Sequence, residues 1–268
     1  MSGIQSPLMR SILILTAVLP EARALARALC LTKMPRANLP FWQNDPKALR
    51  GSVVVGHRSR KTSSNTLCGV TNTAQFRAIG LSLACIGIAG TNLSRVIPPT
   101  TTKLIVMAGV AGALSPELQR GDIVIDTKEP LPHLNRIHLG QIHTASSLIT
   151  TPAQKAQLFN TTRCLAVDME TNIAHEFARK HNATFIALRG ISDTATESLD
   201  PKLLSLIDSD GNPRITQALK MLATRPWKIA ELLRLQTATT TAMTRIAQIF
   251  TELIASGWPE TTTVRPAD

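Results

Sequence analysis

Short apolar runs that alternate with helical patterns constrain the fold of this chain more than any other feature. Strands are predicted at 11–17, 52–56, 82–89, 103–109, 122–126, 164–167 and 184–190. Helices are predicted at 20–31, 153–159, 172–181, 215–223 and 239–256. This alternation is typical of an α/β fold with a parallel or mixed central sheet.

The length of 268 residues suits one domain with a large core, and no linker divides the chain. We therefore expect a single α/β domain over 10–256, with a mixed central sheet flanked by helices. The stretch 57–75 is polar and has no periodicity, which predicts a surface loop. Residues 257–268 are predicted to form a flexible tail.

The cysteines and the apolar runs argue for a cytoplasmic protein without metal. The four cysteines form no CxxC pair, so neither a zinc site nor a disulfide framework is indicated. The apolar run at 11–19 is far shorter than a membrane span and lacks a cleavage site for a signal peptide. His133, His138 and His143 recur every five residues, a spacing that favours surface positions over a metal site.

Positive charge is concentrated in the first hundred residues. The net charge is +11, and residues 1–100 hold 12 lysines and arginines against Glu21 and Asp45. Such asymmetry suggests an anionic partner, either nucleic acid or a membrane surface. Aromatic residues make up only 3% and tyrosine is absent, which argues against nucleic acid. A basic face that only contacts solvent is an equally weighted alternative.

Polar residues or glycines follow several predicted strands. Glu21 opens a helix after the first strand, where ligands gather in α/β sheets, although an acid there also complements the helix dipole. In MAGVAGALSPELQRGD, Gly109 and Gly112 are expected to bracket a strand-to-loop turn open to a ligand. A purely structural turn would explain the glycines almost as well.

The segment CLAVDMETNIAHEFARKH places two carboxylates around Met169, where a strand hands over to a helix. Asp168 is interpreted as a helix cap. Glu170, near the positive end of the helix, is expected to stay ionised and could accept hydrogen bonds from two vicinal hydroxyls. Arg189 and Asp193, which flank Ser192, leave the next strand together.

The stretches TAVLPEARAL, MAGVAGALSPELQRGDIVI, AVDMETNIAHEFARKH and FIALRGISDTA together resemble the nucleoside phosphorylase and nucleosidase superfamily. The pattern is most similar to methylthioadenosine/S-adenosylhomocysteine nucleosidases and hopanoid-associated phosphorylases, with LDPKLLSLIDSDGNPRI extending the second similarity. The resemblance implies a partly barrel-like mixed sheet, a homo-oligomer, and metal-free cleavage of the N-ribosidic bond of a purine nucleoside.

The resemblance also implies roles for individual residues. Asp193 would protonate the departing purine, and Glu170 would hold the ribose hydroxyls. Glu21 would position the attacking water, and Arg189 would orient that region. The implied substrate-binding residues are Met169, Gly109, Ala111, Gly112 and Ser192. Met169 is equally well explained as a core residue that fills a gap.

Several functional alternatives stay open at this point. Val110 stands where the nucleosidases often have serine, and no convincing set of phosphate-binding arginines is found. Hydrolysis is favoured by the TAxxPE start, but phosphorolysis with phosphate as co-substrate is the alternative, and no other cofactor is expected. A hopanoid-linked nucleoside such as adenosylhopane would call for peripheral contact with an anionic membrane, through Arg58, Arg60 and Lys61 first. An inactive nucleoside-binding protein and a basic nucleic-acid-binding protein are the other candidates.

Overall fold

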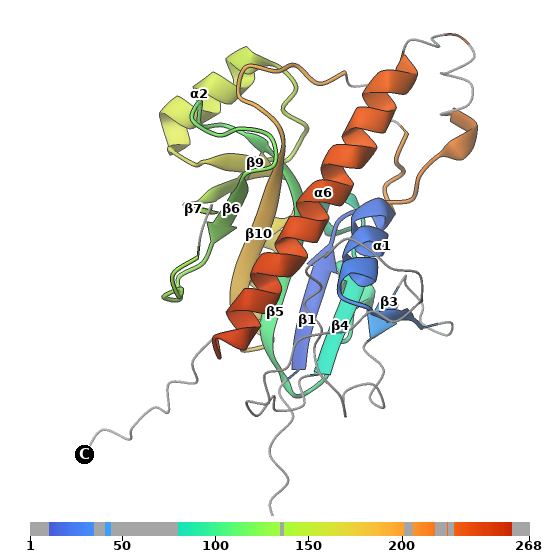
Figure 1. Ribbon diagram of the computed structural model, residues 1–268, viewed down its shortest axis with the longest axis vertical. Helices are drawn as coiled ribbons and strands as arrows, with labels where there is room; N and C mark the ends of the chain where they lie inside the picture. The colour runs from blue at the N-terminus through green and yellow to red at the C-terminus, as the bar shows by residue number, and fades with distance from the viewer. Residues whose placement is uncertain are drawn as a thin grey trace, which may run out of the picture.

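A mixed β-sheet forms the centre of the computed structural model (Figure 1). The structure describes residues 11–34, 41–43, 80–134, 137–200, 206–217, 224 and 228–258. Within these residues ten strands form one sheet with the order β2-β3-β4-β1-β5-β10-β6-β7, and β8 and β9 extend it from β5. The α/β fold class predicted from the alternation of strand and helix patterns is confirmed.

The strand and helix boundaries are as follows. The strands are β1 Ser11–Thr16, β2 Thr32–Lys33, β3 Phe41–Gln43, β4 Gly80–Cys85, β5 Thr102–Ala113, β6 Ile123–Asp126, β7 Ile137–Leu139, β8 Ile142–Thr144, β9 Ala166–Asp168 and β10 Thr184–Asp193. The α-helices are α1 Leu19–Ala28, α2 Pro152–Thr162, α3 Thr171–Lys180 and α6 Lys228–Ala255. Two 3-10 helices, η2 Ile88–Gly90 and η3 Leu93–Arg95, follow β4.

The strands β4, β1, β5 and β10 are adjacent and parallel. Their carboxyl ends therefore meet at one edge of the sheet, where α/β proteins bind ligands. The strand β5 is twelve residues long and pairs with β1 near its start, with β10 over most of its length and with β9 at its end. This sharing of one long strand bends the sheet and brings the β9–α3 junction to the same edge.

Helices cover both faces of the sheet. On one face α1 and α6 lie side by side across the strands, as Figure 1 shows, and their apolar residues pack with every second residue of β1 and β5. On the other face Ala174 and Ala178 of α3 pack against the alternate residues of the same strands. The continuous apolar runs of the predicted strands thus have their alternate residues in two separate cores, one on each face of the sheet.

Several element boundaries differ from the prediction, and three of these differences are large enough to change the local structure. The strand predicted at 82–89 ends at Cys85, and the chain then turns into η2. Gly109 and Gly112, predicted to bracket a turn, both lie inside β5, which continues to Ala113 because β9 and β10 supply hydrogen-bonding partners there. The last helix begins at Lys228, ahead of the predicted 239.

Four predicted segments lie wholly or partly outside the described residues: the strand at 52–56, the loop at 57–75, the helix at 215–223 and the tail at 257–268. The loop contains Arg58, Arg60 and Lys61. Of the predicted tail, Gly257 and Trp258 are described. The Trp258 side chain is buried in the α1–α6 core, and its indole N–H donates to the carbonyl of Pro130 at 2.8 Å, so the packed chain extends at least that far.

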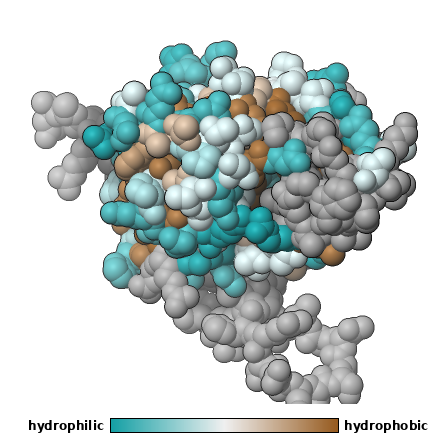
Figure 2. Space-filling model, turned by 90° about the horizontal axis from the view of Figure 1, so that it is seen from above, coloured by the Kyte–Doolittle hydropathy of each residue, from teal (hydrophilic) through white to brown (hydrophobic). Residues whose placement is uncertain are grey.

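The surface of the molecule is mixed in character. Figure 2, a view from above, shows hydrophilic residues over much of the coloured surface with hydrophobic residues among them. Of the helices in the described ranges, none has both the length and the apolar character that crossing a bilayer requires.

The contact between β10 and α6 gives a test of the packing. A Cβ added at Gly190 would lie 2.5 Å from the Cβ of Ala242 on α6. We predict that Gly190→Ala lowers the free energy of unfolding by about 1–3 kcal/mol, because the helix must move off the strand. Gly80→Ala is the matched control, since its added Cβ would only reach ordinary contact with Ser11 at 3.4 Å. Urea unfolding of both variants would measure the effect, and equal stabilities would contradict this account of the contact.

Candidate active site

The side chains expected at the carboxyl edge of the sheet do gather there. Glu21 comes from α1, just after β1, and reaches the backbone of β5. Arg189 and Asp193 come from the end of β10, and Asp168 and Glu170 come from the β9–α3 junction. All five of these residues are buried.

Glu21 joins the β1–α1 turn to the middle of β5. Its Oε1 accepts a hydrogen bond from the N–H of Val110 at 2.8 Å, and its Oε2 accepts one from the N–H of Val18 at 3.3 Å. Burial raises the pKa of Glu21 to about 7, against the lowering influence of the Arg189 charge and of the Val110 hydrogen bond. The contact with Val18 is a local one at the start of α1, as expected for an acid in the first helical turn. The contact with Val110 joins two segments far apart in the chain, and a favourable interaction with the helix dipole would not require it.

Gly109 has a packing reason for lacking a side chain. A Cβ at this position would collide with Nη1 of Arg189 and would come within 2.9 Å of Oε1 of Glu21. The side chains of Glu21 and Arg189 therefore both pack directly against the backbone of β5 at Gly109. The glycine was correctly singled out from the sequence, but it serves the approach of two side chains and not a turn.

Arg189 is fully buried among carboxylates. Its Nη2 forms an ion pair with Oδ2 of Asp168 and lies 3.4 Å from Oε2 of Glu170. Burial opposes the positive charge, but the carboxylates of Asp168, Glu170 and Glu21 outweigh it and raise the pKa of Arg189. Nε and Nη1 of Arg189 are buried without a hydrogen-bond partner among the described residues. Buried N–H groups of this kind are costly unless an acceptor reaches them.

The N-cap position of α3 is occupied by Glu170 and not, as predicted, by Asp168, although Asp168 accepts hydrogen bonds from the first residue of the helix and is also a charge partner. Its Oδ1 accepts from the first helical N–H of α3, that of Thr171, at 3.2 Å, and its Oδ2 accepts from the hydroxyl of the same residue at 2.5 Å. The ion pair with Arg189 was not predicted. It explains why this carboxylate is buried at the start of α3 instead of facing solvent.

Glu170 differs from its expected surroundings. Helix α3 was expected to keep this group ionised. In the structure burial raises its pKa, while the charge of Arg189 is the largest influence in the opposite direction. Its Oε1 also accepts from the N–H of Ala89 at 2.9 Å. Ala89 has a φ of 50°, a left-handed backbone that is strained for a non-glycine residue and that recurs at functional sites.

Asp193 lies at the other end of the group and is paired with a lysine. The Nζ of Lys155, on α2, is 2.5 Å from Oδ2 of Asp193, and the Oγ of Ser192 is 2.6 Å from Oδ1. The β5–β10 register shifts between Ile191 and Asp193, so Ser192 is the extra residue of a bulge. Bulges commonly redirect a side chain next to an active site, and here Asp193 faces Gly112 of β5, whose added Cβ would lie 3.1 Å from Oδ2.

A hollow beside Asp193 is lined by residues of the β9–α3 junction, β5 and the loop before α2. Its lining residues are Gly112, Ala145, Ser147, Leu148, Ile149, Val167, Asp168, Met169, Asp193 and Leu199. Of the predicted substrate-binding residues, Met169 and Gly112 line this hollow. The other three predicted residues are not among its lining residues. Gly109 packs against Glu21 and Arg189. The Oγ of Ser192 lies 3.2 Å from the carbonyl oxygen of Ala111.

Two residues of the site were not found from the sequence. Ala89 contributes only its backbone N–H, and a backbone contact cannot be identified from the residue type. Lys155 did leave a signal: it stands in the first turns of α2, directly after the capping box of Thr151 and Gln154, where the helix dipole disfavours a cation. Among the described residues no group of histidine, cysteine and acidic side chains is arranged to hold a metal ion.

Comparisons with known proteins agree with the motifs. The sequence model of the phosphorylase superfamily matches residues 126–223, the part of the chain that contains Lys155, Glu170, Arg189 and Asp193. No curated protein sequence matches the chain significantly. The resemblance to this superfamily inferred from the motifs is confirmed.

Solved structures share the fold over nearly the whole chain. A 5′-methylthioadenosine/S-adenosylhomocysteine nucleosidase from Helicobacter pylori has a TM-score of 0.54 at 15% identity, covering 92% of this chain and 99% of its own. Futalosine hydrolase from the same organism has a TM-score of 0.54 at 13% identity, covering 93% and 99%. A 5′-methylthioadenosine nucleosidase from Arabidopsis thaliana has a TM-score of 0.54 at 12% identity, covering 94% and 97%. The hopanoid-associated branch of the resemblance stays a prediction.

The raised pKa of Glu21 predicts a pH-dependent stability. Between pH 4.5 and about 7 the folded chain keeps a proton on Glu21 that the unfolded chain has lost, so the free energy of unfolding falls as pH rises. Relative to Glu21→Gln, which does not titrate, the native chain should lose about 3 kcal/mol across this range. Urea unfolding at several pH values measures the difference. The prediction would be contradicted if the free energies of unfolding of the native chain and of Glu21→Gln changed equally with pH. Glu117→Gln, at an exposed position, is the control and should follow the native chain.

Proposed function

We propose that this protein cleaves the N-ribosidic bond of a purine nucleoside, with water as the attacking group. One observation carries the proposal: two different acid–base centres lie on the same strand. The Glu21–Arg189 centre packs on Gly109, and Asp193 packs on Gly112. Three residues of a strand span about 10 Å, the length that a ribose and its base occupy together. Residues 168–170 join the two centres, because Asp168 and Met169 line the hollow beside Asp193 and Glu170 contacts Arg189.

The roles of the two centres follow from the charges that the reaction creates. As the bond from the sugar carbon to the ring nitrogen breaks, its electron pair stays with the base and the sugar becomes positive. Asp193 gives a proton to a ring nitrogen of the base, and the oxygen of a water molecule bonds to the sugar carbon. Glu21 takes the proton that this water releases. A carboxylate whose pKa is about 7 is well matched to proton uptake near neutral pH.

Glu170 suits the sugar side of the reaction. It is buried beside Arg189 and keeps contacts with the N–H of Ala89, so its carboxylate is held in place before substrate binds. A fixed carboxylate can accept hydrogen bonds from the ribose hydroxyls and stabilises the sugar more as its positive charge grows. Met169, which lines the hollow, would pack against the same sugar.

The charge around Arg189 favours water over phosphate as the attacking group. Three acidic groups surround this guanidinium: the carboxylates of Asp168 and Glu170, and Glu21, whose pKa of about 7 leaves it partly ionised at neutral pH. A phosphate anion placed there would meet more negative than positive charge, whereas a neutral water can donate to Glu21 and accept from Arg189. The unpartnered Nε and Nη1 of Arg189 supply N–H groups for such an acceptor. This supports hydrolysis, and phosphorolysis remains the alternative outcome of the test below.

A hopanoid-linked nucleoside such as adenosylhopane is the more specific substrate that the sequence resemblance suggests. The described part of the stretch that carries this resemblance lies against the turns of the candidate site. The carbonyl of Ser209 accepts from Ile88, and that of Gly211 accepts from Leu19. These contacts put the segment next to the turns that bear Ala89 and Glu21, where it could contact whatever is attached to the sugar.

The proposed function predicts release of free base from nucleosides. Adenosine, inosine, 5′-methylthioadenosine, S-adenosylhomocysteine, futalosine and adenosylhopane should be incubated with the purified protein, with and without phosphate, and assayed for base, free sugar and sugar 1-phosphate. We expect base and free sugar without any need for phosphate. Sugar 1-phosphate that appears only with phosphate would show phosphorolysis, and no base from any nucleoside would overturn the proposal.

Glu170→Gln should lower kcat more than it changes KM. The lost negative charge matters most when the sugar is positive, so the loss belongs to the transition state, and we expect kcat to fall by roughly 100-fold. Glu176→Gln on the exposed side of α3 is the control and should leave both constants unchanged. A rise of KM with unchanged kcat would mean that Glu170 only binds the ground state.

A further inference from the structure

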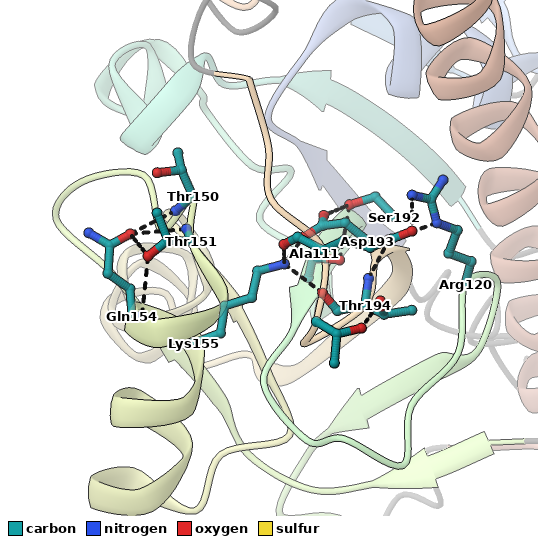
Figure 3. Close-up of polar contacts among 11 residues, drawn as sticks. Ala111, Arg120, Thr150, Thr151, Gln154, Lys155, Ser192, Asp193 and Thr194 are labelled. Carbon is teal, nitrogen blue, oxygen red and sulfur yellow. Dashed lines mark hydrogen bonds and ion pairs between the residues drawn. The ribbon is translucent and has the colours of Figure 1, made fainter.

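We propose that Lys155 is the positioning residue of Asp193, holding the carboxylate in place and stabilising its charge when its proton leaves. The proposal rests on the proposed function. The Lys155 side chain is fully buried, and its ammonium group donates to Oδ2 of Asp193 at 2.5 Å, to the carbonyl of Thr194 at 2.7 Å and to that of Glu197 at 2.9 Å. Figure 3 shows the side chain extending from α2 toward Asp193 and Thr194.

The place of Lys155 on its helix is unfavourable by itself. Thr151 and Gln154 form the capping box that starts α2, and Lys155 follows immediately, near the positive end of the helix dipole. Burial adds the cost of removing an ammonium group from water. Packing of an apolar face does not explain a buried lysine here. The three acceptors do, because they use all of the ammonium protons and offset the loss of water.

The partners of Lys155 are themselves fixed. The Glu197 carboxylate accepts from the N–H of Thr194 at 2.9 Å, which closes the loop after β10. Arg120 holds the same carboxylate through Nε at 2.9 Å and Nη2 at 2.5 Å. Lys155 therefore connects Asp193 to a loop that has its own support. The Oγ of Ser192, 2.6 Å from Oδ1, holds the other carboxylate oxygen.

This arrangement has a consequence for proton transfer. When the carboxyl group of Asp193 gives its proton to a ring nitrogen of the departing base, the base gains the proton and keeps the electron pair of the broken bond, and Asp193 becomes an anion. The ammonium group of Lys155 is already in contact with that anion. A charge placed in advance where negative charge develops lowers the barrier without reorganisation. Asp193 then regains a proton from solvent in the next turnover.

The test compares two leaving groups. Lys155→Met keeps the length of the side chain and removes the charge. With a purine nucleoside, we expect kcat to fall by roughly 100-fold with a small change in KM, as for the loss of one preorganised donor. With 4-nitrophenyl riboside, whose leaving group departs as a stable anion without a proton, the same variant should lose less than about threefold. Lys103→Met, on the exposed start of β5, is the control and should match the native chain on both substrates.

The double variant Lys155→Met/Asp193→Asn separates positioning from structural damage. If Lys155 acts through Asp193, the double variant is no slower on the purine nucleoside than Asp193→Asn alone, and it also leaves no unpaired buried charge. Multiplied losses, equal losses on both leaving groups, or a Lys155→Met variant that keeps more than a third of native purine turnover would each overturn the proposal. A native chain that releases no base from any nucleoside would instead overturn the proposed function, and this inference with it.

Discussion

The burial of Arg189 sets the arrangement of everything around it. A fully buried guanidinium is stable only where charge and hydrogen-bond acceptors surround it, and removing a partner from such a pair costs about 3–5 kcal/mol. Asp168 supplies the contact from the start of α3, and Glu170 adds a second carboxylate from the same junction. Gly109 leaves room for the guanidinium against β5. The ends of β5, β9 and β10 are therefore tied together through one side chain.

The parallel core of the fold could be predicted because its strands are short apolar runs that alternate with helical patterns. Ile12 and Ile14 of β1 pack with α1 and α6, while Leu13 and Leu15 pack on the opposite face, as the alternation requires. The short strands β2, β3, β7 and β8 could not be predicted in the same way. Each has only two or three residues, too few to form an apolar run of that kind, and each exists because a neighbouring strand supplies hydrogen bonds.

The candidate site was predictable at the level of residues but not of partners. Glu21, Glu170, Arg189 and Asp193 stand at strand or helix ends, and the topology brings such ends together. Which of these side chains contact one another depends on the distances between segments that are far apart in the sequence, and the sequence alone does not give those distances. Asp168 therefore looked like a cap alone, and Lys155 like a helix residue of no special interest. Ala89 lay inside a predicted strand, whereas β4 stops at Cys85 and the following turn aims its N–H at Glu170.

The two ends of the candidate site differ in their balance of charge, and this difference matches the asymmetry of the proposed bond cleavage. Around Arg189, the carboxylates of Asp168 and Glu170 outnumber the cation, and Glu21 adds a further negative charge when it is ionised, so this end favours positive charge on a sugar. At the other end one ammonium group contacts Asp193, so in the proposed reaction the anion that Asp193 becomes on giving its proton to the base is compensated. A site built to bind a neutral nucleoside without changing it would gain nothing from this difference. The cost of burying Arg189 and Lys155 is therefore easier to explain by the charges of a reaction than by binding alone.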